Sequence, residues 1–391
     1  MNERILISGG SIAGLALAHW LTRYGFRTTV VERAPALRTG GNGVDVRAGA
    51  VEVAERMGIM SRVRELAADV RGMKFVDSSD RVLARVDTRD PGSVEIMRGD
   101  LVALLGEVTD TEYLFDDSVR RLEQDDRGVL VTFERAPARR FHLVVGADGM
   151  HSTVRRLAFG PEARFVRFKD HYFAFAGADA SLGEDRWVTM FNTPGRMAGI
   201  YRSGNHAQAK AYFMFRSAPL EYDHRDVTEH KHLISERFAG DRSWRIQELL
   251  DSALTDPEFY FDALGQVRMD SWHNGRVALV GDAAWCASPA SGAGAELALV
   301  GAYRLAGELA AADGDHLAAF PRYHTVHRPL VDRKQRIGPN VRIMIPGTAG
   351  GRFVRDAFAR LPLMNAIGAL DRRLQARNAA ALPDYSRPRR P

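Results

Sequence analysis

The chain has 391 residues, 45% of them hydrophobic, and 54 basic against 49 acidic side chains give a net charge of +5. This length predicts about two or three domains, and the apolar runs are shorter than the roughly 20 residues that span a bilayer, so we expect a soluble protein. The lone cysteine, Cys286, excludes an internal disulfide framework and a cysteine-rich zinc site, which is typical of cytoplasmic proteins. The basic tail 387–391 is interpreted as solvated and disordered, and no nucleic-acid partner is expected.

The first predicted elements are a strand at 5–7 and a helix over 15–21, joined by a glycine-rich turn. Gly9 allows a tight turn and Gly14 lets the helix pack closely on the strand, as in the G-x-G-x-x-G fingerprint of dinucleotide-binding domains. Ser11 replaces the middle glycine, but it is small and its hydroxyl can donate to a phosphate oxygen. The free N–H groups of the helix N-terminus favour a diphosphate at this turn.

A second strand at 28–31 ends in Glu32, whose carboxylate can accept hydrogen bonds from ribose hydroxyls. Because a carboxylate repels a 2′-phosphate, the expected nucleotide is FAD or NAD rather than NADP. The alternative is a glycine-rich turn in a domain without nucleotide. A secretory signal is a second alternative because Arg4 precedes an apolar stretch, but the glycines and the lack of a small-residue cleavage site argue against it.

The central part of the chain is expected to alternate between short strands and few helices. Helices are predicted over 50–57, 100–107 and 228–239, with Asp100 as an N-cap. Strands are predicted at 75–77, 82–86, 94–97, within 111–135, at 141–145, at 171–175 and at 211–216. The region from about 165 to 270 is rich in aromatic residues and lacks glycine phosphate motifs, so we assign it to substrate binding.

A further motif follows the predicted strand 276–280, where Asp282 is placed to accept hydrogen bonds from the hydroxyls of a ribityl chain. The small-residue loop 288–294 offers amides to a flat polar ring edge and leads into a predicted helix over 295–310. The N-terminus of that helix favours negative charge on a reduced flavin. The alternative is a loop whose small residues serve packing alone. No second G-x-G-x-x-G follows for a separate nicotinamide nucleotide.

The Gly9 turn, Asp148-Gly149 and Gly281-Asp282 together resemble the motifs of group A flavoprotein monooxygenases of the para-hydroxybenzoate hydroxylase type. Within this group, the chain is similar to the tetracycline-modifying and natural-product-tailoring branch. The resemblance implies an α/β fold with a Rossmann-like FAD-binding domain, an interleaved, mostly antiparallel β-sheet domain for substrate, and C-terminal helices. The FAD-binding domain is assigned to 1–70, 98–160 and 272–335, the substrate domain to 71–97 and 161–271, and the C-terminal region to 336–391.

By resemblance, Arg47 and Arg98 contact the FAD, Asp148 serves both FAD and pyridine nucleotide, and Asp282 holds the ribityl chain. Trp285 stands where many relatives carry histidine, so no proton-transfer role is expected there. The expected cofactor-binding residues are Gly9, Ser11, Ala13, Gly14, Glu32, Arg33, Arg47, Arg98, Asp148, Asp282, Pro289, Gly292, Ala293, Gly294 and Ala295.

The resemblance also implies the reaction. NADPH or NADH binds transiently and reduces the FAD, O2 then forms a flavin C4a-hydroperoxide, and one oxygen atom passes to an aromatic or polyketide-like small molecule. Hydroxylation is the expected outcome, although epoxidation and Baeyer–Villiger insertion use the same framework. The alternatives are an FAD-dependent dehydrogenase and a non-catalytic flavoprotein that sequesters a ligand; the Trp-x-Trp-x-Ile-Pro motif of a halogenase is absent. No catalytic side chain is assigned, and a monomer or a homodimer is expected.

Strand alternation predicts a flat apolar cavity for the substrate, although core packing is the alternative for each aromatic residue. The strand candidates are Tyr172, Phe175, Met190, Tyr201, Phe213 and Phe215, within a wider set that also includes Phe173, Phe191, Tyr212 and Met214. By resemblance, the loop with Pro289 and Gly292 forms the wall between the flavin ring and the substrate, so Pro289 is a further pocket candidate. No histidine has a metal-ligand spacing, so no metal site is expected, and Cys286 is interpreted as a small buried residue. Helices predicted within 337–382 are expected to cover the domain junction or the pocket mouth, with a dimerisation or membrane-surface helix as the alternative.

Overall fold

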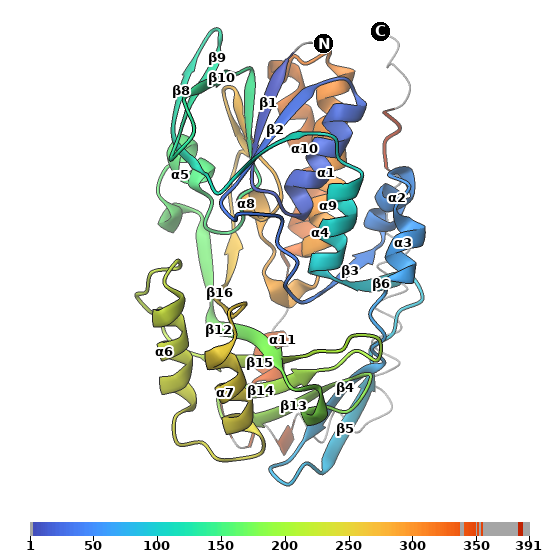
Figure 1. Ribbon diagram of the computed structural model, residues 1–391, viewed down its shortest axis with the longest axis vertical. Helices are drawn as coiled ribbons and strands as arrows, with labels where there is room; N and C mark the ends of the chain where they lie inside the picture. Colours follow the sequence, from blue (N-terminus) through green and yellow to red (C-terminus); the bar gives the residue numbers. More distant parts are fainter. Residues whose placement is uncertain (1–2, 337–339, 349, 352, 355–381, 386–391) are drawn as a thin grey trace.

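The computed structural model describes residues 3–336, 340–348, 350–351, 353–354 and 382–385 (Figure 1). Most of the predicted C-terminal helical region and the basic tail 387–391 lie outside the described residues. The described part divides into an upper half built on a largely parallel sheet and a lower half built on a largely antiparallel one (Figure 1).

The upper sheet has six strands in the order β17-β18-β11-β1-β2-β7. Their bounds are β1 (Arg4–Ser8), β2 (Arg27–Glu32), β7 (Glu112–Phe115), β11 (Leu143–Gly146), β17 (His273–Asn274) and β18 (Val277–Leu279). All pairings are parallel except that of β17 with β18. The centre of β1, with Ile5, Leu6 and Ile7, is fully buried, as expected of a parallel strand covered on both faces.

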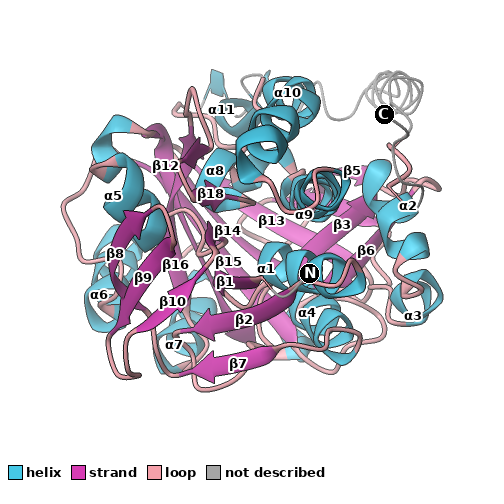
Figure 2. Cartoon of the chain, turned by 90° about the horizontal axis from the view of Figure 1, so that it is seen from above, coloured by secondary structure: helices cyan, strands magenta, loops and turns pink. Residues whose placement is uncertain are grey.

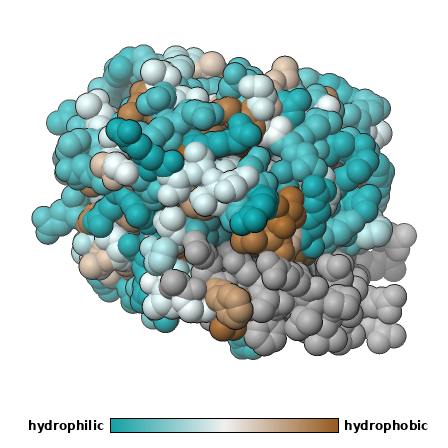
Figure 3. All heavy atoms as spheres, turned by 90° about the horizontal axis from the view of Figure 1, so that it is seen from below, coloured by the Kyte–Doolittle hydropathy of each residue, from teal (hydrophilic) through white to brown (hydrophobic). Residues whose placement is uncertain are grey.

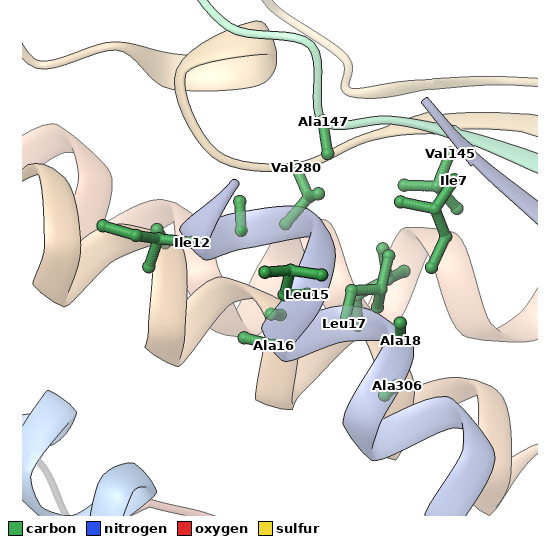
Figure 4. Packing of buried hydrophobic residues seen from close by; sticks show 14 of the residues in the cluster. Ile7, Ile12, Leu15, Ala16, Leu17, Ala18, Val145, Ala147, Val280 and Ala306 are labelled. Atoms are coloured by element: carbon green, nitrogen blue, oxygen red, sulfur yellow. The ribbon is translucent and has the colours of Figure 1, made fainter. Parts of the chain in front are cut away.

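Helices and a small sheet cover the two sides of this upper sheet. The helices are α1 (Ile12–Arg23), α4 (Arg98–Glu107), α5 (Thr153–Phe159), α9 (Gly294–Ala311) and α10 (His316–Lys334). Figure 2 shows α1, α4 and α9 gathered on one side, and the three-stranded sheet of β8 (Val119–Asp125), β9 (Gly128–Phe133) and β10 (Arg139–Phe141) on the other. Small side chains bring α1 and α9 close, and Ala18 lies beside Ala306 (Figure 4).

The lower sheet has seven strands in the order β16-β12-β15-β14-β13-β4-β5. Their bounds are β4 (Gly72–Val76), β5 (Val82–Asp87), β12 (Val166–Ala178), β13 (Trp187–Thr193), β14 (Arg196–Tyr201), β15 (Ala209–Arg216) and β16 (Tyr260–Val267). Helices α6 (Val227–Phe238) and α7 (Ile246–Thr255) cover one face and enclose a second hydrophobic core. The helix expected over 228–239 corresponds to α6, whereas no helix was expected at α7.

Short elements connect the two halves. Strands β3 (Gly43–Arg47) and β6 (Ser93–Met97) form a two-stranded antiparallel sheet, so the segment 71–97 divides: β4 and β5 join the lower sheet and β6 does not. The remaining helices are α2 (Gly49–Arg56), α3 (Met60–Glu65), α8 (Asp282–Trp285) and α11 (Asn340–Met344). Helix α4 begins earlier than predicted, with Met97 as its N-cap; Asp100 lies in its first turn instead, where a negative charge complements the helix dipole.

The α/β fold predicted from the sequence is therefore confirmed, with a mixed architecture of parallel and antiparallel sheets. Seen from below, the described surface is mostly hydrophilic (Figure 3). Within the described ranges, every helix is too short or too polar to cross a membrane.

Candidate active site

The turn between β1 and α1 depends on two glycines. Gly9 has a φ of +112°, and a Cβ placed on it would lie 2.5 Å from the carbonyl oxygen of Ala147. A Cβ on Gly14 would lie 1.9 Å from the carbonyl oxygen of Gly9, so α1 can approach the turn only without a side chain at that position. Ser11 is the N-cap of α1, but its hydroxyl bonds to no helix N–H group. The first N–H groups of α1 consequently remain available to an anion.

Glu32 stiffens this turn from the end of β2. Its Oε2 accepts a hydrogen bond from Gly10 N at 2.7 Å, and its Oε1 accepts one from Ala34 N at 2.9 Å. The residue is 8% exposed, and a carboxylate has about four lone-pair sites, so two amide bonds leave acceptor capacity. Arg33, the next residue, is exposed.

Arg98 places a positive charge beside the N-terminus of α1. Its Nη1 donates to Ser11 Oγ at 3.2 Å and its Nη2 to the carbonyl oxygen of Gly40 at 2.7 Å. Burial lowers the pKa of the guanidinium, and among the residues that the structure describes it forms no salt bridge. A partly buried cation without an anionic partner, next to free helix N–H groups, suits a diphosphate.

Asp148 and Arg155 organise the turn after β11. Ser152 Oγ donates to Asp148 Oδ1, Val154 N donates to Oδ2 at 3.1 Å, and burial raises the pKa of the Asp148 carboxyl. The fully buried Arg155 donates from Nη1 to the carbonyl oxygen of Ala283 at 3.0 Å. Arg155 thereby ties the Asp148 turn to the turn that carries Asp282.

Asp282 lies at the start of α8, directly after Gly281. Asp282 is an exposed residue, although burial raises the pKa of its carboxyl. A Cβ on Gly281, whose φ is +66°, would lie 2.7 Å from the Cβ of Ala13, so this turn and the first turn of α1 touch. Trp285 instead points into the core, where its ring packs 4.6 Å from that of His327, centroid to centroid.

Cys286 is buried, and its Sγ contacts the carbonyl oxygen of Gly265 at 3.7 Å. Burial raises the pKa of its thiol, which keeps the sulfur protonated and unreactive. This agrees with the interpretation of Cys286 as a packing residue.

The small-residue loop 288–295 is held by Arg47 from β3. Arg47 Nη2 donates to the carbonyl oxygen of Ser291 at 3.1 Å, and its Nε lies 3.7 Å from Glu296 Oε2. Gly292 adopts a left-handed φ of +56°, and a Cβ there would lie 3.5 Å from Asp45 Oδ2. Pro289, Gly292 and Gly294 are exposed, whereas Ala293 and Ala295 are buried.

These turns meet because β1, β11 and β18 are parallel and adjacent, so their carboxyl ends share one edge of the sheet. Ligands of open α/β sheets bind outside this edge. The edge here combines a glycine cradle, free helix N–H groups, the cation of Arg98 and the accessible carboxylate of Asp282. This donor set fits a dinucleotide with a diphosphate and a polyol chain, as in FAD.

The lower sheet presents its two faces to different surroundings, and this divides the predicted pocket residues. Tyr172, Phe213 and Phe215 are at most 2% exposed and pack in the core beneath α6 and α7. The structure thus places these three on the helix-covered face of the lower sheet, opposite the face that carries Phe175. Their strands alternate as predicted, but helices cover the face on which they stand.

The opposite face carries an aromatic surface next to the upper half. Its members, called the aromatic face below, are Phe175, Tyr201, Tyr212 and Tyr260. Ring centroids are 5.3 Å apart for Phe175 and Tyr212, 5.4 Å for Phe175 and Tyr260, and 6.2 Å for Tyr201 and Tyr212. Met190 shares this side of the sheet but packs with Ile345 from the segment after α11. Tyr260 was not assigned to the pocket from sequence, although its register opposite Phe175 follows from the same alternation.

Comparison with known proteins identifies the family. The model of the FAD binding domain family matches residues 3–316. The chain belongs to this family of FAD-binding proteins. A flavin-dependent monooxygenase of Legionella longbeachae is 38% identical over 86% of this chain and 88% of its own length. An FAD-dependent monooxygenase of Sarocladium schorii, asL4, is 36% identical over 78% of this chain and 75% of its own length.

A solved structure supports the same assignment. The tetracycline destructase Tet(55) superposes with a TM-score of 0.82 at 35% identity, covering 98% of this chain and 99% of that protein. The sequence-based prediction of an FAD-dependent monooxygenase of the group A type is therefore confirmed, and FAD is the cofactor of this flavoprotein.

Proposed function

We propose that this flavoprotein uses NADPH or NADH to reduce its FAD and inserts one oxygen atom of O2 into a polycyclic aromatic or polyketide-like small molecule, by hydroxylation. The observation that carries the proposal is the position of the aromatic face. It lies beside the edge of the upper sheet at which the turns after β1, β11 and β18 meet. Tyr260 lies close enough to Arg98 to raise the pKa of its guanidinium, against the larger lowering by burial. Asp282 in turn lies close enough to Tyr260 to help raise the pKa of its phenol. A flat hydrophobic substrate bound on these rings is thereby next to the motif turns.

The names of the relatives support this substrate class. The solved structures of Tet(51) and Tet(55), at 31% and 35% identity, are of tetracycline destructases. Polycyclic phenols such as tetracycline have both the flat shape and the electron-rich carbons that the proposed reaction needs.

The turns at the carboxyl ends of β1, β2 and β18 bind different parts of the FAD in this proposal. The turn with Gly9, Ser11, Ala13 and Gly14 takes the diphosphate together with Arg98, while Glu32 and Arg33 face the adenosine part. Asp282 accepts from the ribityl hydroxyls, and the loop 288–295 with Pro289, Gly292, Ala293, Gly294 and Ala295 lies along the ring. Asp148 acts chiefly by ordering its turn, since its two oxygens already accept bonds from Ser152 and Val154. When it is bound and reduced, the FAD activates O2.

The side chains of this protein position the loop, orient the substrate and exclude water. Arg47 holds the loop 288–295 in place through Ser291 and Glu296. The aromatic face orients the substrate by stacking, with Phe175, Tyr201 and Pro289 retained as pocket residues and Met190 at its covered end. Apolar surroundings exclude water from the reacting atoms, which suppresses unproductive oxidation of the cofactor.

The test is NADPH and NADH oxidation by the FAD-loaded protein with and without tetracycline, followed by product mass after reaction under isotope-labelled O2. A gain of one labelled oxygen atom supports the proposal. Loss of two hydrogens identifies a dehydrogenase. Tight binding of tetracycline without turnover identifies a sequestering flavoprotein, and either of these results overturns the monooxygenation of this substrate class.

A further inference from the structure

The two-stranded sheet of β3 and β6 has one apolar and one polar face. In its register Asp45 stands opposite Glu95, and Arg47 stands opposite Ser93. Because cross-strand partners share a face, these four side chains lie on one side of the sheet. On the other side, Val46 and Ile96 are fully buried in the upper core. The apolar face thus fixes the sheet in place and turns the polar face outward from that core.

Glu95 links this polar face to the aromatic face. Tyr201 Oη donates to Glu95 Oε1 at 3.0 Å, and Tyr201 is only 5% exposed. The neighbouring Asp45 reaches the loop 288–295, since a Cβ on Gly292 would lie 3.5 Å from its Oδ2. Glu95 therefore lies between the loop assigned to the flavin ring and the rings assigned to the substrate.

The charges around Glu95 leave it without a counter-ion. From β3 it faces Asp45, whose negative charge repels it, and from β14 and β15 it faces the hydroxyls of Tyr201 and Tyr212. Arg47, the cation on the same polar face, is engaged by Ser291 O, Asp45 and Glu296. Across the described ranges, no Lys, Arg or His lies within salt-bridge distance of Glu95.

These surroundings set the proton affinity of the carboxyl. Burial raises the pKa of Glu95 to about 7, an effect that the hydrogen bond from Tyr201 opposes and the charge of Asp45 reinforces. A carboxyl that exchanges its proton near neutral pH, and that contacts a ring of the aromatic face through Tyr201, has the properties of a general base for a substrate bound there. A purely structural acceptor for Tyr201 would need no ionisable group at this position.

We propose that Glu95 is the general base of the substrate pocket and that it accepts the proton of a phenol or enol hydroxyl of the substrate. The O–H bond of the substrate breaks, the proton moves to the Glu95 carboxylate, and the electron pair stays on the substrate oxygen. The resulting phenolate or enolate is more electron-rich at the ring carbon that receives oxygen. When the product regains aromaticity, the carbon that received oxygen releases its proton to solvent, and Glu95 returns the proton that it holds to the product oxygen. The Glu95 carboxylate is thereby restored. The inference rests on the proposed function and narrows its substrates to acidic phenols and enols.

The first test compares Glu95→Gln with Glu55→Gln, which changes an exposed carboxylate of α2 whose partner is Arg64. Flavin absorbance and thermal melting establish that each variant is folded and holds FAD. For tetracycline turnover, kcat/KM of the unmodified enzyme is expected to rise with pH through neutrality. E95Q is expected to lose about 100-fold in kcat and this pH-dependent limb, while E55Q keeps both. An unchanged limb in E95Q overturns the proposal.

The second test requires no turnover. Tetracycline bound to the oxidised protein without NADPH is expected to show the absorbance of its ionised chromophore in the unmodified protein and of its neutral form in E95Q. An infrared difference titration of the ligand-free holoenzyme is expected to show a carboxyl band that titrates near neutral pH and is absent from E95Q. If tetracycline neither binds nor reacts, the proposed substrate class fails while the infrared result still decides the state of Glu95. If the Glu95 carboxyl titrates at the ordinary glutamate value, the assignment of Glu95 as the general base is overturned.

Discussion

His151 Nε2 lies 3.1 Å from Asp262 Oδ1, and this contact joins the turn after Asp148-Gly149 to β16 of the lower sheet. The other ring nitrogen of His151 lies 3.0 Å from Glu162 Oε1. Tyr260 also donates to Asp262, at 2.8 Å, so the contact reaches the aromatic face. A charged histidine between two carboxylates thus fastens the two halves of the flavoprotein next to the proposed substrate pocket.

The His151 contact predicts a pH-dependent stability. Burial alone would lower the pKa of His151, but the hydrogen bonds to Asp262 and Glu162 outweigh it and raise the pKa to about 9. Because the folded-state pKa exceeds the unfolded value of 6.5, this contribution is complete below pH 6.5 and is lost as the pH rises to about 9. The shift corresponds to at most about 3 kcal/mol.

The measurement is urea unfolding of the unmodified protein and of His151→Gln between pH 6 and 9. The difference in unfolding free energy is expected to shrink by roughly 2 kcal/mol as the pH rises across this range. His232→Gln, which changes an exposed histidine of α6, serves as the control. A difference that is constant with pH would mean that His151 is not charged in the folded protein.

Removing the guanidinium of Arg98 is expected to weaken FAD binding. Charge-assisted hydrogen bonds contribute about 1.5–3 kcal/mol, so Arg98→Ala should raise the Kd for FAD by about 10- to 100-fold. Quenching of flavin fluorescence on titration of the apoprotein measures this directly. Arg62→Ala, on the exposed side of α3, should bind FAD as the unmodified protein does. Equal affinities for both variants would remove Arg98 from the cofactor site.

The first turn of α1 predicts opposite outcomes for two small substitutions. A methyl group at Gly14 meets the carbonyl oxygen of Gly9 at 1.9 Å, so Gly14→Ala should destabilise the protein by about 1–3 kcal/mol and weaken FAD binding. Ser11→Gly restores the usual fingerprint and removes only one hydroxyl, so FAD affinity should change by less than about tenfold. Thermal melting and FAD titration of both variants check this. A larger loss for Ser11→Gly than for Gly14→Ala contradicts the assignment.

The two faces of the lower sheet predict different roles for two phenylalanines. Phe215 is 1% exposed beneath α6 and α7, so Phe215→Ala should cost about 3–5 kcal/mol of stability by leaving a cavity. Phe175 lies on the aromatic face, so Phe175→Ala should chiefly raise the KM for tetracycline. Urea unfolding and steady-state kinetics on both variants separate the effects. A KM effect confined to the Phe215 variant would reverse the assignment of the two faces.

By itself, the sequence determined the cofactor and the family of this protein. Gly9, Gly14 and Asp282 meet local backbone and hydrogen-bonding requirements at the ends of strands. Because such requirements depend on residues that are neighbours in the sequence, the motifs can be recognised without the fold. Their order along the chain was sufficient to predict one FAD served by three turns.

Only the tertiary structure decided which side chains face the proposed pocket. Alternation places Phe213 and Phe215 on one face of β15 and Tyr212 on the other, but it does not tell which face α6 and α7 cover. The sequence therefore could not decide which of the two sets faces the proposed pocket. The role proposed for Glu95 could not be predicted from the sequence either. Its partners come from β3 and β14, distant in sequence, and the proton affinity of a carboxyl depends on the neighbours and the burial that the fold brings to it.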